Sequence, residues 1–141
     1  MKDLEVLRSY IKEVTKYFTK VKRIKLKPYP KVVLTHTDEY HPIEKTGKYN
    51  HKKNVIILYN VEERGLVDIL RTYAHELIHR SQHLTGHIVH HKEPDDPKYA
   101  EHDKHMRKME RQAYERGSIY LRDFLDHIRY DMSKKKIIIF Y

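Results

Sequence analysis

The chain has 141 residues and no cysteine, and its 29 lysines and arginines against 20 aspartates and glutamates give a formal net charge of +9. This length fits a single domain, residues 1–141, with a hydrophobic core, and the absence of cysteine excludes disulfides, thiolate metal sites and a cysteine nucleophile. The amino-terminus lacks an apolar signal-peptide core, and no apolar run approaches the about 18 residues of a membrane span, so we expect a cytoplasmic protein.

Apolar residues at helical spacing predict an amphipathic first helix over residues 3–20. The densest basic run, residues 20–27, is interpreted as a solvated approach to the next element, with a phosphate-binding patch as the alternative. Residues 31–35 predict a strand, because they are mainly β-branched and apolar and follow two prolines that exclude helix. Residues 36–53 contain proline, glycine and mixed polar groups and predict a long loop or a wide hairpin. Abundant charge together with many Lys, Glu, Tyr and Ile is compatible with the surface of a thermophile's protein.

Residues 54–59 predict a second strand. Their continuous apolar character fits either burial on both faces or an edge beside a cleft. Residues 61–85 predict a long helix that Gly86 ends. Asn60 and Glu63 are expected to form its N-cap and capping box.

Residues 98–129 predict a second long helix, which starts with Asp96 as N-cap and Pro97 in the first turn. Gly117 lies on its apolar stripe and marks either a close approach to a neighbour or a break. Residues 134–141 combine three lysines with a β-prone end and are expected to form a final strand at a sheet edge. We therefore predict an α+β fold, in which a small mixed or antiparallel sheet packs against the N-terminal helix and the two long helices.

The helix over residues 61–85 contains the H-E-x-x-H sequence His75-Glu76-Leu77-Ile78-His79. Two imidazoles four residues apart on a helix point the same way and can share a Zn²⁺ ion, while the intervening glutamate can act as a general base. Both histidines lie about 150–170° from the centre of the helix's apolar stripe, which disfavours a role in the core. We interpret the motif as a metal site, with solvated surface histidines as the alternative.

Glu110 is the expected third ligand. By angular count it lies on the apolar stripe of the second long helix, where a carboxylate is costly unless it is paired or binds a cation. His83 continues the four-residue series, but it stands about 12 Å along the axis from His75, too far to share one ion. His102 shares the stripe with Glu110 and remains the rival third ligand.

The H-E-x-x-H motif is followed, 31 residues after its second histidine, by Glu110-Arg111-Gln112-Ala113. This arrangement resembles the H-E-x-x-H plus E-x-x-A pattern of the gluzincin zinc metallopeptidases, and the short chain is most similar to the minigluzincins. The likeness covers about residues 54–116. It implies a zinc metalloendopeptidase with the ligands His75, His79 and Glu110 and the base Glu76.

The departures from this pattern leave two roles open. Many gluzincins place an aspartate four residues after the glutamate ligand to orient a zinc histidine, but this chain has Tyr114 there. The oxyanion stabiliser is also unassigned, and the candidates Tyr114, Tyr120 and His102 can equally be packing residues. The strand Val55-Ile56-Ile57-Leu58 is expected to pair with an extended substrate, as the cleft-rim strand does in similar peptidases.

The predicted activity is hydrolysis of a peptide or protein substrate by metal-activated water, with Zn²⁺ as cofactor and no membrane partner. Minigluzincins are zymogens whose C-terminal segment occupies the cleft, so the resemblance implies an inhibitory role for residues 134–141 as the alternative to an edge strand. The alternative function is a basic nucleic-acid-binding module with a structural zinc or no metal. A peptidase recruited to nucleic acid would combine the two.

Overall fold

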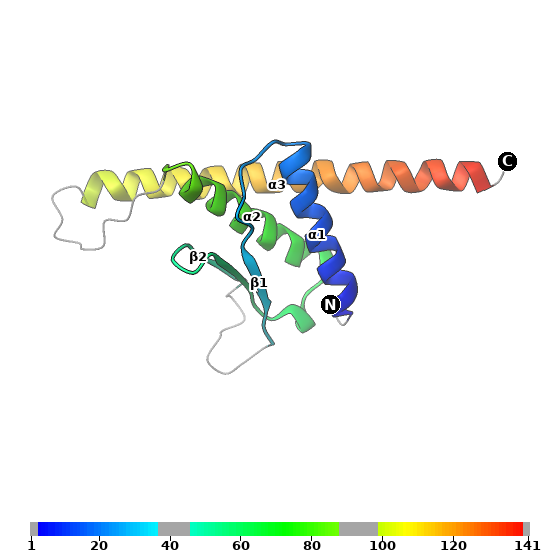
Figure 1. Cartoon of the computed structure of the whole chain (residues 1–141), viewed down its shortest axis with the longest axis horizontal. Helices are drawn as coiled ribbons and strands as arrows, with labels where there is room; N and C mark the ends of the chain where they lie inside the picture. Colours follow the sequence, from blue (N-terminus) through cyan, green and yellow to red (C-terminus); the bar gives the residue numbers. More distant parts are fainter. Residues whose placement is uncertain (1–2, 37–45, 88–98, 140–141) are drawn as a thin grey trace.

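Three α-helices, one 3-10 turn and a three-stranded sheet make up the described part of the chain. The computed structural model describes residues 3–36, 46–87 and 99–139, and for 99–102 and 131–139 it describes only the backbone. The elements follow in the order α1 (Leu4–Lys20), β1 (Lys31–Leu34), β2 (Gly47–Asn50), β3 (Val55–Leu58), η1 (Val61–Glu63), α2 (Leu66–Leu84) and α3 (Tyr99–Ile139). The predicted α+β class is confirmed. Figure 1 shows α3 along the longest axis, with the other elements against one side of it.

Helix α1 forms as its sequence predicts. The Asp3 side chain caps it by accepting a hydrogen bond of 3.1 Å from the backbone N–H of Val6. Glu5 in the first turn and Lys20 in the last turn complement the helix dipole. The helix buries one stripe, made of Leu7, Ile11, Val14 and Phe18. This stripe belongs to the same core cluster as the apolar face of α2.

Helix α2 starts later than predicted. Asn60 has a φ of 57°, in the left-handed region, and its side chain caps no helix, so the predicted capping box between Asn60 and Glu63 is wrong. A 3-10 turn follows Asn60, and Gly65 is the N-cap of α2. At the other end Gly86, with a φ of 75°, ends the helix as predicted.

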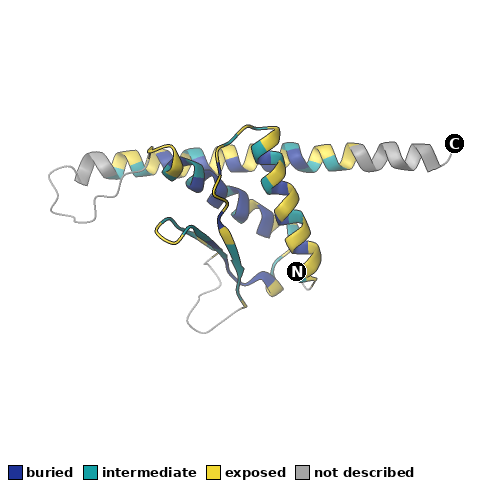
Figure 2. Cartoon of the chain, in the orientation of Figure 1, coloured by how far each residue is buried: buried dark blue, intermediate teal, exposed yellow. Residues whose placement is uncertain are grey.

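Helix α2 is buried on more of its surface than an amphipathic helix at the protein surface would be. The middle of its predicted apolar stripe, from Ile69 to Leu77, is buried, but so are Glu76, Ile78, Arg80 and Gln82. The reason is that the sheet, α1 and α3 all pack against α2. Figure 2 shows much of α2 in the dark blue of buried residues. The polar side of α2, the helix that carries the H-E-x-x-H motif, is therefore partly covered by neighbouring elements, α3 among them.

The sheet has the strand order β1-β3-β2, with β1 parallel and β2 antiparallel to β3. Within residues 36–53, predicted as a long loop or a wide hairpin, residues 47–50 form β2, which pairs with β3. Residues 37–45, which precede β2, lie outside the described residues. Strand β3 is central, and Ile56 and Leu58 are buried while Val55 and Ile57 are partly covered. The alternative that this strand forms an edge beside a cleft is wrong, because both of its backbone edges are paired.

Helix α3 runs through the segment that was expected to be a strand. The predicted strand over residues 134–141 is wrong for 134–139, which continue the helix to Ile139, while 140–141 lie outside the described residues. Extending an existing helix adds one hydrogen bond per residue without a new nucleation cost, and β-propensity depends on packing against a neighbouring strand. In Figure 1 this end of α3 lies away from the sheet. The predicted N-cap Asp96 and Pro97 are not among the described residues.

The axes of α2 and α3 approach closely at Gly117. A Cβ atom added there would lie 3.1 Å from the backbone nitrogen of His75 and 3.2 Å from the carbonyl carbon of Ala74. Ala113, one turn earlier in α3, is completely buried. Gly117 is therefore a close-approach point, one of the two roles predicted for it, and α3 continues through it without a break.

Gly117→Val is expected to lower the free energy of unfolding by about 1–3 kcal/mol, because the side chain would press against backbone that cannot turn away. Glu115→Val, a change at an exposed position of the same helix, is the matched control. Urea unfolding of both variants measures the difference. Equal midpoints for the two variants would contradict the close-approach role.

Candidate metal centre

Three polar side chains from α2 and α3 converge on one point. The two oxygens of Glu110 lie 2.7 Å from His75 Nε2 and 2.8 Å from His79 Nε2. The two Nε2 atoms are 3.2 Å apart. Among the described residues this is the single group of three or more His, Asp or Glu side chains that could hold a metal ion. The structure thus brings together the two histidines of the H-E-x-x-H motif and Glu110, the three residues predicted as metal ligands.

The donor atoms fit a small divalent cation. Ligand atoms around a tetrahedral zinc ion are separated by about 3.3 Å, close to the spacing of the two imidazole nitrogens. The carboxylate oxygens lie closer to the imidazole nitrogens, at 2.7 and 2.8 Å. Two imidazoles and a carboxylate suit zinc and also other divalent transition metals, so the donor set defines a metal class rather than one element.

Glu110 reaches the histidines from the border of the α3 interface. The expectation that it lies within a buried stripe is wrong, because 56% of its side chain is exposed. The stripe is centred on Met109, Ala113, Leu121 and Phe124. Glu110 is about 100° around the helix from Met109, which places it at the margin of the stripe. The exposed fractions of the histidine side chains are only 18% and 13%, so the site has one open side.

Gln82 orients the second histidine. Its Oε1 lies 2.8 Å from His79 Nδ1, and its Nε2 donates to the backbone oxygen of Met109 at 2.9 Å and to Gln112 Oε1 at 3.0 Å. Because these donor bonds define which end of the amide is oxygen, His79 donates from Nδ1 and keeps the Nε2 lone pair for a cation. Gln82 therefore supplies the orienting acceptor that the sequence left unassigned. Its only sequence signal is its position three residues after His79 on the same helix.

Glu76 is a buried carboxylate beside this site. It is 7% exposed, and its Oε2 has no hydrogen-bond partner among the described residues. Burial raises the pKa of Glu76 to about 7; the nearby His79 opposes this rise, and the charge of Glu110 adds to it. Burial also lowers the pKa of His75, helped by the neighbouring His79 and opposed by Glu110. The site thus combines His75, whose neutral form is favoured by burial, with a carboxyl group that readily exchanges a proton near neutral pH.

A cleft of about 870 Å³ adjoins the three converging side chains. His75, Glu76 and Glu110 contribute to its lining, and α3 lines it as far as Arg129. Thr46, just before the edge strand β2, also borders it. The cleft is therefore walled by both long helices and by the start of β2.

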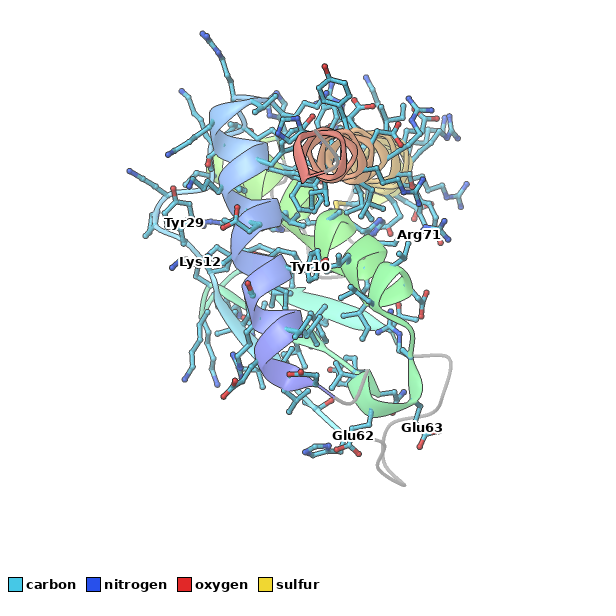
Figure 3. All side chains as sticks on the ribbon, turned by 90° about the vertical axis from the view of Figure 1, so that its right-hand side faces the viewer. Tyr10, Lys12, Tyr29, Glu62, Glu63 and Arg71 are labelled. Carbon is cyan, nitrogen blue, oxygen red and sulfur yellow. The ribbon has the colours of Figure 1, made fainter. Side chains whose placement is uncertain are left out.

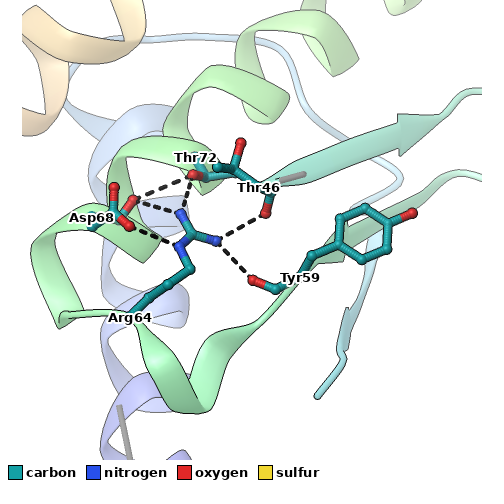
Figure 4. Close-up of polar contacts among 5 residues, drawn as sticks. All are labelled: Thr46, Tyr59, Arg64, Asp68 and Thr72. Atoms are coloured by element: carbon teal, nitrogen blue, oxygen red, sulfur yellow. Dashed lines mark hydrogen bonds and ion pairs between the residues drawn. The ribbon is translucent and has the colours of Figure 1, made fainter. Parts of the chain in front are cut away.

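Arg64 links the start of β2, at the cleft, to α2 (Figure 4). Its Nη1 donates to the backbone oxygens of Thr46 at 2.9 Å and Tyr59 at 3.0 Å. Its Nε pairs with Asp68 at 2.7 Å, and its Nη2 donates to the Thr72 hydroxyl. One guanidinium thus joins the cleft edge of β2, the end of β3 and the first turns of α2.

Strand β3 does not occupy the position expected of a substrate strand. The expectation that Val55-Ile56-Ile57-Leu58 pair with a substrate backbone is wrong, because β1 and β2 already pair with both edges of β3. The strand that borders the cleft is β2, through Gly47. A Cβ at Gly47 would clash with the Thr72 side chain, so β2 lies directly on α2. Sequence reasoning placed this strand only within a wide hairpin.

The three candidate oxyanion stabilisers have different locations. Tyr114 lines the cleft, and its ring centroid lies 5.0 Å from that of His75. Tyr120 instead packs edge-on against Phe18 at 5.8 Å and below the Lys22 ammonium, and it lines another pocket, so its candidacy is wrong. Its position ten residues after Glu110 turns it to a different face of α3. The side chain of His102 lies outside the described residues, and its roles stay predictions.

Comparison with known protein families, curated proteins and solved structures finds no match for this chain. The gluzincin resemblance therefore depends on the motif and its spacing alone. Within the described residues, no helix has the length and apolar character needed to cross a membrane.

Glu110→Ala and His79→Ala each remove an atom that would bind zinc directly. Loss of a residue that only orients a ligand weakens metal binding about 10–100-fold, so each of these variants is expected to weaken it by more than that. Zinc offered to protein purified without a His-tag and then counted by elemental analysis should reach one equivalent in the parent chain. Glu115→Ala, an exposed change on the same helix, is the control. Undiminished zinc in Glu110→Ala would contradict this ligand set.

Gln82→Met should lower zinc affinity about 10–100-fold while leaving all three donor atoms in place, because His79 loses the acceptor that holds its tautomer and ring orientation. Competition with a chromophoric chelator measures the affinity. Gln112→Met, which removes only the more distant bond of the same network, should have a much smaller effect. Equal affinity in the two variants would show that the network is structural rather than orienting.

Proposed function

We propose that this protein is a zinc-dependent peptidase that hydrolyses peptide bonds with metal-activated water. The observation that carries the proposal is the buried Glu76 carboxylate. One of its oxygens has no hydrogen-bond partner in the described part of the chain, and the residue borders the cleft beside the converging His75, His79 and Glu110. A structural ion would not need an adjacent base. Three protein ligands are also the number typical of catalytic rather than structural zinc.

His75, His79 and Glu110 would hold the ion. A bound zinc ion supplies Lewis acidity, which lowers the pKa of water and polarises a carbonyl group. Glu76 accepts the proton from the attacking water and afterwards delivers it to the leaving amine nitrogen. In the metal-free protein burial raises the pKa of Glu76 to about 7, so this carboxyl group exchanges protons readily near neutral pH.

Two further groups have positions that support this chemistry. The Tyr114 hydroxyl belongs to the cleft lining beside His75 and is proposed to donate to the developing oxyanion. Strand β2 has a single strand neighbour, β3, among the described strands, so we propose that its other edge pairs with the extended substrate backbone. Arg64 holds the start of that strand in register with α2.

Glu76→Gln is expected to keep one equivalent of zinc and to lower peptide hydrolysis at least about 10²–10⁴-fold, because the amide cannot accept the proton while the ligands are unchanged. Cleavage of a mixed peptide pool, followed by mass spectrometry, together with elemental analysis measures both quantities.

Glu115→Gln is the matched control and should retain the parent activity, since Glu115 is exposed on α3 and does not line the cleft. Hydrolysis that persists in Glu76→Gln would refute the assignment of the base. No hydrolysis by the zinc-loaded parent protein would count against the proposed function itself.

A further inference from the structure

We infer that the cleft selects acidic peptides, with Arg71, Arg122 and Arg129 binding their carboxylates in the part of the cleft beyond the metal ligands. The inference rests on the proposed peptidase function and adds the substrate class. It concerns residues that take no part in the proposed chemistry. All three arginines line the same cleft as His75 and Glu76, and all three are exposed.

The antiparallel packing of α2 and α3 brings the arginines to one part of the cleft. Gln82 donates to Met109, whereas His75 touches Gly117, so residue numbers fall along α2 as they rise along α3. Arg71, one turn before His75, therefore lies on the side of the metal ligands toward which α3 continues to Arg122. Figure 3 shows Arg71 on the flank where α2 passes beside α3.

The spacing matches an extended peptide. At 1.5 Å per residue, Arg122 and Arg129 are about 18 Å and 28 Å along the α3 axis from Glu110, while Arg71 is about 6 Å along α2 from His75. An extended peptide advances about 3.3–3.6 Å per residue. Acidic residues within about two to eight positions of the scissile bond would thus meet a guanidinium.

The charges of this part of the cleft are not balanced internally. Two aspartates also line it, but Asp68 is already paired with Arg64, which leaves Asp126. Arg71 and Arg129 form no ion pair with a described residue, and Arg122 approaches only the neighbouring Asp123, at 3.7 Å. Arginine forks match carboxylates in geometry as well as in charge.

The chain's own C-terminal segment is a poor occupant for this region. Residues 134–136 are three lysines, which the arginines would repel. The backbone of residues 134–139 also continues α3 rather than turning back. The observations therefore favour an acidic peptide from another molecule.

Binding to full-length Glu76→Gln protein tests the inference without hydrolysis. The probes are fluorescently labelled peptides of alternating glutamate and alanine and matched peptides with glutamine in place of glutamate, each with a free or an amidated C-terminus. Fluorescence anisotropy should show about tenfold tighter binding of the glutamate peptide at low salt, and added salt should reduce this advantage. The amidated forms distinguish side-chain carboxylates from the terminal one.

Arg71→Ala in the same background should weaken binding of the glutamate peptide about three- to fivefold and leave the glutamine peptide unchanged, because an exposed ion pair contributes modestly. Arg71→Lys should recover part of the loss, and removal of all three arginines should abolish the preference. Arg111→Ala, an exposed arginine of α3 outside the cleft lining, should have no effect.

The outcomes separate this inference from the proposed function. Hydrolysis by the parent protein with no preference for glutamate would overturn the substrate class and leave the peptidase in place. Arginine-dependent binding of the glutamate peptide without any hydrolysis by the parent protein would support acidic-peptide binding and refute the peptidase. Tighter, Arg71-dependent binding of a single-stranded oligonucleotide would overturn the inference in favour of a nucleic-acid groove.

Discussion

The close approach of α3 to the backbone of α2 at Gly117 determines how near Glu110 lies to His75 and His79 in the candidate metal centre. A Cβ atom added at Gly117 would lie only 3.1 Å from the backbone nitrogen of His75, so a larger residue there would push the two helices apart. Glu110 sits two turns before Gly117, so any displacement of α3 is carried directly to its contacts with both histidines. Buried Ala113 between them keeps the helix backbones close along this distance. A single small residue thus sets the separation of the ligand-bearing helices.

The same packing converts the polar side of α2 into an interior surface, which explains its buried polar groups. Gln82 is satisfied there by the backbone of Met109 and by Gln112, and its oxygen in turn holds His79. Glu76 is not satisfied to the same extent, since its Oε2 lacks a partner within the described residues. A buried carboxyl group with an unused oxygen is unfavourable for stability, and the hydrophobic cluster shared by α1, β3 and α2 offsets this cost.

The cleft has two chemically different regions. Glu76 and Glu110 lie with His75 at one of them, and Arg71, Arg122 and Arg129 line the other. Arg64 does not belong to the arginine-lined region. Its guanidinium already pairs with Asp68 and donates hydrogen bonds to the backbone oxygens of Thr46 and Tyr59. Arg64 therefore links β2 to α2. Arg71, seven residues later in the chain, is exposed and lines the cleft, where a ligand can reach it.

Local sequence determined the features that depend on helical phase and chain order: the span of α1 and the shared face of His75 and His79. These follow from 3.6-residue periodicity, which needs no knowledge of neighbours. For Gly117 the sequence left open a close approach or a break, and for the third ligand it favoured Glu110 over His102. Tertiary structure decided the rest. The central position of β3, the helical state of residues 134–139, the exposure of Glu110 and the turning of Tyr120 away from the cleft depend on which surfaces meet. Gln82 acquired its role only because α3 covers it, since a hydrogen-bond network between helices is set by their packing and not by either sequence alone.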